Sequence, residues 1–112
     1  MTREDLKNSP VHLIYVTLEN KTEALEIART LVSERWVACA NIMDSVTSIY
    51  EWQGEVQEGR ECVLVAKTTE QNLEGARERI VQLHSYECPC VVTILLSSGA
   101  PPFMKWVNEQ TR

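Results

Sequence analysis

The feature that most constrains the fold is a long β-hairpin around the turn pair Gln53-Gly54. Its arms, residues 39–52 and 55–68, each run for roughly twelve residues or more, whereas natural strands usually have five or six. At about 3.4 Å per residue, such an arm is roughly 40 Å long. A compact chain of this size has a radius of gyration of about 13 Å and a globule about 34 Å across. Part of the hairpin must therefore project, and its apolar positions predict that another chain covers it.

The other segments complete the element order β-α-β-β-α-β with a C-terminal helix. Asn20, followed by Glu23, predicts a capping box at the start of the first helix, and Gly59 predicts a bulge in the returning arm of the hairpin. Pro101 and Pro102 fit the first turn of the last helix. The predicted strands are 11–17, 36–52 with a break near 43–44, 55–67 and 91–96, and the predicted helices are 20–35, 69–83 and a short one from 101.

Right-handed crossovers applied to this order predict an α+β, ferredoxin-like split β-α-β sheet with both helices on one face. We expect residues 1–10 to form a flexible N-terminal tail and residues 11–112 to form one domain. The second face of the sheet is left bare by this arrangement. Because its central strands are apolar on both sides, this face is a second reason to expect an oligomer.

The charge and cysteine content exclude several functions. A net charge of −5 argues against a nucleic-acid or anionic-membrane partner, and no apolar run reaches the length of a membrane span. Three of the four cysteines lie in apolar, strand-like runs, which favours free thiols in a reducing compartment over a disulfide framework. We therefore expect a cytoplasmic protein without a membrane or nucleic-acid partner.

Three segments together resemble one known family. They are residues 37–42 (VACANI), 47–55 (TSIYEWQGE) and 84–89 (HSYECP), supported by Lys67-Thr68-Thr69 and Lys105-Trp106. With these residues the chain resembles the CutA1 divalent-cation tolerance proteins over residues 11–108. The resemblance implies a homotrimer of ferredoxin-like subunits, architecturally akin to PII signalling proteins. It also implies association with copper or other divalent cations, no obligatory cofactor and no catalytic reaction.

The chain departs from the family pattern at three positions. Ser85 stands where the family has proline, and Cys90 stands where an acidic residue is common. Some bacterial members carry a cysteine in the first strand that is proposed as a copper ligand, and Val16 occupies that position here. That form of the metal site is therefore absent or rebuilt in this chain.

The sharpest candidate for chemistry is Cys88-Pro89-Cys90. On an extended backbone, residues two apart point the same way, so both sulfurs can approach one ion. Thiolates select soft metals, and His84 lies just upstream with an imidazole, while Glu87 can add an oxygen. The alternative, which residue statistics favour, is that both cysteines are buried small apolar side chains and that His84 is hydrogen-bonded in a loop.

Four further residues are candidates for an inter-subunit cleft or interface. Tyr50 and Trp52 share one face of the hairpin and suit either a subunit contact or a stacking surface. Tyr86 belongs to the family-like segment and is grouped with them. Lys67 either helps to hold an anion at a helix N-terminus or is an exposed charge at a strand end.

The remaining polar residues are expected to be structural. We expect Cys39 and Cys62 in the core and His12 at the solvent-exposed start of a strand. Glu55, Glu58 and Glu61 are expected on a solvated hairpin edge, with a loose and poorly selective cation surface as the alternative. No orienting acid, phosphate loop or metalloprotease motif accompanies a nucleophile. Together with these residues, the resemblance to the CutA1 family implies a non-catalytic, trimeric cation-binding protein of metal tolerance. The alternative is a PII-like signalling or scaffolding trimer that binds a small anion or a partner protein at its inter-subunit cleft.

Overall fold

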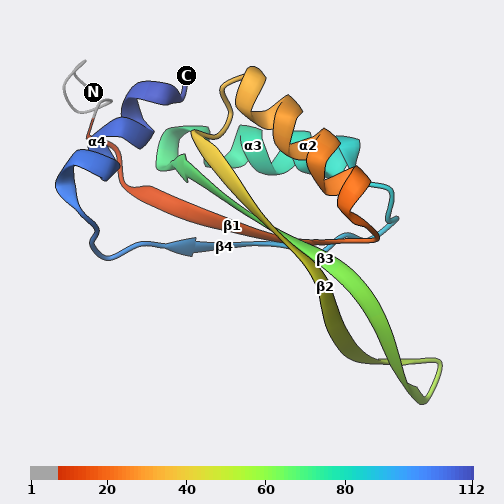
Figure 1. The fold of residues 1–112 in the computed structure, drawn as a ribbon. Helices are drawn as coiled ribbons and strands as arrows, with labels where there is room; N and C mark the ends of the chain where they lie inside the picture. The colour runs from red at the N-terminus through yellow and green to blue at the C-terminus, as the bar shows by residue number, and fades with distance from the viewer. Residues whose placement is uncertain (1–7) are drawn as a thin grey trace.

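The computed structural model describes residues 8–112, and its element order matches the prediction. All strand pairs are antiparallel and the sheet order is β2-β3-β1-β4, which is the ferredoxin-like arrangement (Figure 1). The elements are β1 (Val11–Leu18), α2 (Lys21–Ser33), β2 (Cys39–Trp52), β3 (Glu55–Thr69), α3 (Glu70–Leu83), β4 (Val91–Leu95) and α4 (Pro101–Gln110).

The core lies between the sheet and the helices α2 and α3, which cover one face of it (Figure 1). Side chains alternate between the faces of a strand, and every second residue of β1 from Ile14 to Leu18 is fully buried on the helical side. The helices supply matching residues at helical spacing. The buried cluster consists of Ile14, Val16, Leu18, Ala24, Ile27, Leu31, Val37, Cys62, Leu64, Ala66, Ala76 and Ile80.

The start of α2 forms only half of the predicted capping box. The Asn20 side chain accepts the N–H of Glu23 at 2.9 Å, as expected for an N-cap. The Glu23 carboxylate does not return to Asn20, however. It accepts hydrogen bonds from the N–H and the hydroxyl of Ser85, at 2.8 and 2.9 Å. The carboxylate therefore ties α2 to the loop after α3.

The end of α2 differs from the prediction because the chain reverses early. The helix ends at Ser33, and Arg35 adopts a left-handed conformation with φ 64°. Its guanidinium donates to the carbonyls of Glu109 and Gln110, at the C-terminal end of α4. Trp36 then packs against α3, and β2 begins at Cys39 rather than at residue 36.

Gly75 is explained by this tryptophan. A Cβ built on Gly75 would lie 2.8 Å from Cη2 of Trp36, closer than real Cβ contacts. Glycine in the middle of a helix costs about 1 kcal/mol relative to alanine. That cost is accepted here because only glycine lets the indole ring lie against the α3 backbone.

The hairpin projects from the body as predicted (Figure 1). The molecule measures 51 × 26 × 22 Å and its radius of gyration is 15.2 Å, larger than a compact chain of this length would have. Gln53 and Gly54 have φ values of 49° and 81°, so both turn residues are left-handed. This is the tight hairpin turn whose twist matches that of the strands.

The bulge in the hairpin is in β2, so the prediction of a bulge at Gly59 is wrong. Gly59 pairs regularly with Ser48, whereas the register shifts between Met43, paired with Val63, and Val46, paired with Glu61. One extra β2 residue is accommodated at Asp44-Ser45, where Ser45 has φ 56° and donates its N–H to the Asp44 carboxylate. A polar pair that tolerates this conformation, rather than a glycine, forms the bulge.

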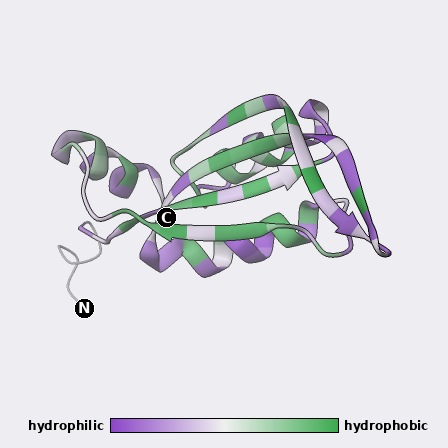
Figure 2. Ribbon diagram, turned by 90° about the horizontal axis from the view of Figure 1, so that it is seen from below, coloured by the Kyte–Doolittle hydropathy of each residue, from purple (hydrophilic) through white to green (hydrophobic). Residues whose placement is uncertain are grey.

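The sheet face opposite α2 and α3 carries apolar side chains, as expected. Met43, Val92 and Ile94 alternate with the core residues and are exposed on this face. Figure 2 views the molecule from this side and shows long hydrophobic stretches along the strands. Apolar surface of this kind marks an interaction site more often than a free surface.

The two ends of the described chain are tied to the body. The N–H of Ser9 donates to the Asn108 side chain, whose amide donates back to the Ser9 carbonyl. The Arg112 guanidinium lies over the Trp36 ring at 3.9 Å. Most of the predicted tail, residues 1–7, lies outside the described residues. Within residues 8–112, the helices are too short or too polar to cross a membrane.

Candidate functional site

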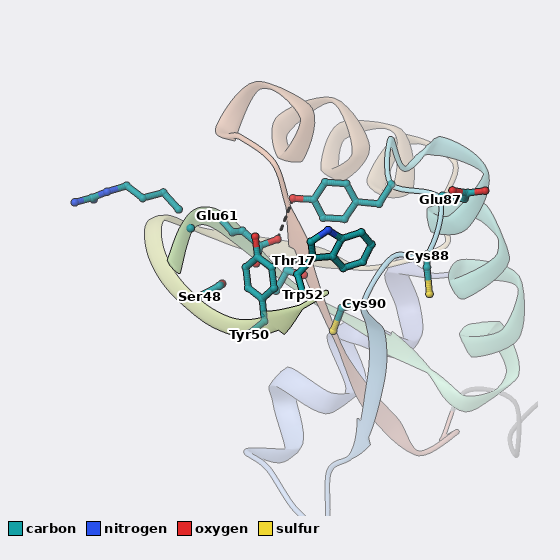
Figure 3. Close-up of a pocket in the computed structure, with 11 residues that line it drawn as sticks. Thr17, Ser48, Tyr50, Trp52, Glu61, Glu87, Cys88 and Cys90 are labelled. Atoms are coloured by element: carbon teal, nitrogen blue, oxygen red, sulfur yellow. Dashed lines mark hydrogen bonds between the residues drawn. The ribbon is translucent and has the colours of Figure 1, made fainter. Parts of the chain in front are cut away.

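A cleft of about 790 Å³ opens where the hairpin leaves the body (Figure 3). Ligand pockets for small molecules commonly have volumes of 300–1,000 Å³. The cleft is lined by residues of β1, β2 and β3 and of the loop before β4. These are Thr17, Ser48, Tyr50, Trp52, Gly59, Arg60, Glu61, Tyr86, Glu87, Cys88 and Cys90.

The bulge determines which side of the hairpin presents its aromatic residues to the cleft. Before the bulge, Met43 is on the uncovered face together with Val63; after it, Val46 is on that face together with Glu61. The extra residue thus moves the even-numbered residues of β2 to the cleft side. If the same residues paired regularly from Met43 onward, with no bulge, Tyr50 and Trp52 would point away from the cleft.

Gly59 gives the Tyr50 ring its place in the cleft. A Cβ on Gly59 would be 3.7 Å from both Cε1 and the hydroxyl of Tyr50, so the ring lies over this glycine. Tyr50 and Trp52 remain 50 and 63% exposed. Figure 3 shows both side chains beside Glu61, which comes from the facing strand. The sequence correctly grouped the two aromatic residues on one face.

Tyr86 lines the opposite side of the cleft and is hydrogen-bonded to Glu61. Its hydroxyl donates to Oε2 of Glu61 at 2.9 Å. Burial raises the pKa of Tyr86, and the hydrogen bond to the Glu61 carboxylate raises it further. The phenol therefore remains a donor across the neutral range. Glu61 is part of the cleft, which corrects its assignment to a solvated hairpin edge.

His84 supports the loop that carries Tyr86 and the two cysteines. Its side chain is fully buried. Nε2 lies 2.8 Å from the Thr17 carbonyl and Nδ1 lies 3.1 Å from the N–H of Tyr86, so the tautomer with the proton on Nε2 satisfies both contacts. The prediction that His84 is hydrogen-bonded in a loop is confirmed. Both ring nitrogens are thus in use within the chain.

Glu23 holds the same loop from the side of α2. Its carboxylate accepts both bonds from Ser85 and lies 3.6 Å from Nδ1 of His84. Proline at position 85 would supply neither donor. The departure from the family pattern at Ser85 therefore has a structural partner, which the sequence spacing did not reveal.

The two cysteines of the Cys88-Pro89-Cys90 segment are exposed, and the alternative that they are buried is wrong. Both line the cleft (Figure 3). The structure does not bring them together with His84: across residues 8–112, no group of three or more metal-ligating side chains is close enough to hold an ion. All four cysteines have free thiols, as expected.

The other thiols and His12 differ in their surroundings. Cys62 is fully buried in the core, and burial raises the pKa of its thiol. Cys39 is only half buried, on the face away from the helices. His12 is buried rather than in solvent: Nε2 lies 3.5 Å from a Glu70 carboxylate oxygen, too poorly aligned for a hydrogen bond.

Lys67 is separate from the three aromatic residues with which it was grouped. Its ammonium donates to the Asn41 side chain on the neighbouring strand, and it lies outside the cleft lining. The residues that sequence reasoning missed are Thr17, Glu23 and Glu61. No local pattern marks them, because each reaches the loop or the cleft through a contact between distant segments.

Known proteins resemble this chain along most of its length. The model of the family described as CutA1 divalent ion tolerance protein matches residues 12–110. The CutA homolog of Xenopus laevis is 35% identical over 97% of this chain and 72% of its own length. The divalent-cation tolerance protein CutA of Thermus thermophilus is 38% identical over 88% of this chain and 96% of its own. The chloroplastic CutA of Arabidopsis thaliana is 33% identical over 97% of this chain, which spans 60% of that protein.

Solved structures extend the likeness to the whole fold. The crystal structure of CutA1 from Oryza sativa superimposes with a TM-score of 0.91 at 32% identity, over 95% of this chain and 97% of that one. CutA1 from Ehrlichia chaffeensis gives a TM-score of 0.90 at 32% identity, over 93 and 97%. The family is named for tolerance of divalent cations and not for a reaction. This chain belongs to the CutA1 family of divalent ion tolerance proteins.

Proposed function

We propose that the protein is a homotrimer that binds copper or another soft cation and contributes to metal tolerance by binding rather than by turnover. The observation that carries the proposal is the exposure of Cys88 and Cys90 in one cleft. Thiolates prefer soft metals such as Cu(I) and Zn. The metal is the cargo of the protein in this proposal, and the residues 84–90 are its binding segment.

The two thiols are the primary ligands in this proposal, and Glu87 beside them offers an oxygen. His84 is the proposed third ligand, but its ring already bonds to Thr17 and Tyr86. Metal binding at Nδ1 would require release of the Tyr86 N–H. Ligation by His84 is thus coupled to a movement of the loop, whereas ligation by the cysteines is not.

The test is a titration of the reduced protein with Cu(I) against a competing chelator. We expect Cys88→Ser and Cys90→Ser to weaken binding strongly and Cys39→Ser, which removes a thiol outside the cleft, to leave it unchanged. His84→Gln distinguishes a three-ligand site, which it weakens, from a two-thiolate site, which it spares. Equal, weak binding by wild type and both cleft variants would refute the cysteine site.

The trimer is supported by two surfaces. The sheet face opposite α2 and α3 exposes Met43, Val92 and Ile94, and the projecting hairpin exposes Ile49 and Val56 on its side away from the cleft. Exposed apolar area of this extent is typical of subunit contacts. Light scattering coupled to size exclusion should give three times the chain mass, and a monomer at micromolar concentration would contradict the proposal.

A cytoplasmic location is part of the same proposal. Four free thiols, two of them exposed, suit a reducing compartment. Some relatives are named for other compartments, such as the chloroplastic protein of Arabidopsis thaliana. Microscopy of the full-length protein with a C-terminal fluorescent tag tests the location, and signal confined to an organelle or the cell envelope would refute it.

A further inference from the structure

We propose that the same cleft binds a small organic cation of the alkylammonium class, held by Glu61 and the aromatic side chains around it. This goes beyond metal binding, because it uses the hairpin half of the cleft instead of Cys88 and Cys90. The inference rests on four properties of the cleft: an incompletely paired carboxylate, three aromatic residues, the balance of charge and the volume.

The carboxylate is Glu61. Its Oε2 accepts the hydroxyl of Tyr86 at 2.9 Å. Within residues 8–112, its Oε1 has no hydrogen-bond or ion-pair partner. The bond from Tyr86 holds the carboxylate in the lining of a cleft that is already formed. A fixed, half-satisfied carboxylate attracts a cation at little cost in side-chain entropy.

Aromatic side chains line the cleft around this carboxylate. The Tyr50 ring lies over Gly59, two residues from Glu61 on the same face of β3. Trp52 lies next along that face, and Figure 3 shows Tyr50 and Trp52 beside Glu61. The faces of aromatic rings attract cations, most strongly quaternary ammonium groups that shed water easily. Half-exposed rings of this kind offer such faces to a ligand.

The charges lining the cleft also favour a cation. Glu61 and Glu87 are both in its lining. Arg60 is the one lining residue of opposite charge, but it lies between Gly59 and Glu61 in an extended strand, so its side chain leaves from the other face. The net charge of −5 adds a weak long-range attraction for cations.

The size argues for an organic cation rather than a bare ion at this end. A volume of about 790 Å³ accommodates a small molecule. A single carboxylate with aromatic neighbours is a poor site for a hard divalent ion, which requires six or more oxygen ligands or retained waters. An alkylammonium group contacts the faces of the aromatic rings and pairs with the carboxylate at the same time.

The test compares choline with its neutral carbon isostere, 3,3-dimethyl-1-butanol, on the full-length reduced protein with a metal chelator present. The readout is the set of indole N–H signals in NMR spectra, with the Trp52 signal assigned from Trp52→Phe. We expect saturable shifts of that signal with choline and much weaker ones with the isostere. Equal binding of the two probes, or shifts that never saturate, would overturn the proposal.

The variants separate charge from structure. Glu61→Gln keeps an oxygen for Tyr86 and removes the charge, and we expect choline to bind about two- to fivefold more weakly. Glu58→Gln removes the same charge from the opposite face of the hairpin and should leave binding unchanged. Trp52→Ala should weaken binding by a similar factor, read from the Tyr50 ring signals. If Glu61→Gln and Glu58→Gln behave alike, the proposed carboxylate contact is wrong.

Failure here is distinguishable from failure of the metal proposal. Cys88→Ser with Cys90→Ser should abolish Cu(I) binding and leave choline binding intact, whereas Glu61→Gln should weaken choline binding and leave Cu(I) binding intact. Because the full-length protein is measured in its own assembly, a neighbouring subunit that fills the cleft would appear as absence of choline binding. That result would overturn the organic-cation site alone.

Discussion

The two halves of β3 have the same backbone pairing and opposite environments. In the inner half, Leu64 is 0% exposed between the helices and the sheet; in the outer half, Val56 is 78% exposed on the projecting hairpin. Both residues lie in ladders with β2. The arm therefore relies on strand pairing and cross-strand contacts, whereas the body also has a core. The difference agrees with the proposal that apolar residues of the arm contact other molecules, whereas those of the body serve folding.

The largest effect should come from a direct comparison of the two halves. Leu64→Ala leaves a cavity in the core, and we expect it to lower the free energy of unfolding by about 2–5 kcal/mol. Val56→Ala removes a side chain that is almost entirely in water in the single chain, so in the dissociated monomer it should change the free energy of unfolding by less than about 0.5 kcal/mol. Urea denaturation at a protein concentration low enough for the chain to be monomeric measures both, and similar losses would mean that the arm is packed within the folded unit.

A smaller loss of stability is expected at Gly75 in α3, where the sequence alone suggests that alanine would stabilise the helix. Gly75→Ala should raise helix propensity, yet its Cβ would collide with Trp36. We expect a net destabilisation of about 1–3 kcal/mol, since overpacking outweighs the gain in propensity. The matched variant pairs Gly75→Ala with Trp36→Ala, and it should lose less than the two single changes add up to. Additive losses would show that the contact is not the cause.

The arm should affect assembly where it does not affect folding. Ile49→Ser changes a residue on the side of the hairpin away from the cleft. We expect the secondary structure in circular dichroism to be unchanged while the oligomer dissociates at a higher protein concentration than the wild type. Thr47→Ser, two residues earlier on the same side, is the control. An oligomer of unaltered affinity would remove the arm from the interface.

The rate of thiol labelling tests whether the cysteines of the cleft are more accessible than the cysteine of the core. Cys88 and Cys90 are exposed, whereas Cys62 is buried and its thiol has a raised pKa. Because the thiolate is the reactive form, we expect iodoacetamide to label the cleft pair first and Cys62 only after unfolding. Mass spectrometry of timed samples identifies the order. Early labelling of Cys62 would mean that the body opens more readily than its packing indicates.

The smallest effect concerns the Tyr86 phenol at the junction of body and arm. Its pKa is raised, chiefly by burial, above the ordinary value of about 10. Its contribution to stability is thus fully present below about pH 10 and is lost as the pH rises further. In an ultraviolet titration, Tyr86→Phe should leave the absorbance change near pH 10 unaltered. A smaller absorbance change near pH 10 in the variant than in the wild type would show that Tyr86 titrates at the ordinary pKa.

The sequence predicted the parts of the fold that depend on local pattern. Strand and helix order, the Gln53-Gly54 turn and the pairing of Tyr50 with Trp52 on one face follow from side-chain periodicity and turn chemistry. The bulge was wrongly predicted at Gly59 because glycine often marks a bulge. Here its missing side chain accommodates the Tyr50 ring, which is a contact across strands that no local rule describes.

The site was predicted less completely because its side chains come from distant segments. Cys88 and Cys90 were expected to be buried from the statistics of their residue type, but the chain leaves them beside an open cleft. Glu23 was predicted as a capping residue and instead holds Ser85, 62 positions away. Glu61 was expected in solvent and receives the Tyr86 hydroxyl. Each error concerns surroundings that only the tertiary structure determines.

The extra residue at Asp44-Ser45 acts as a phase shift within a single strand. The alternation that fills the core ends before it, and the alternation that faces the cleft begins after it. Deleting one residue there would leave a regular ladder in which Met43 still pairs with Val63 and Val46 with Glu61, so Tyr50 and Trp52 would keep their side of the arm. A change of one codon in length is therefore tolerated at this point, whereas a one-residue slip of register elsewhere in the arm would exchange its two chemical faces.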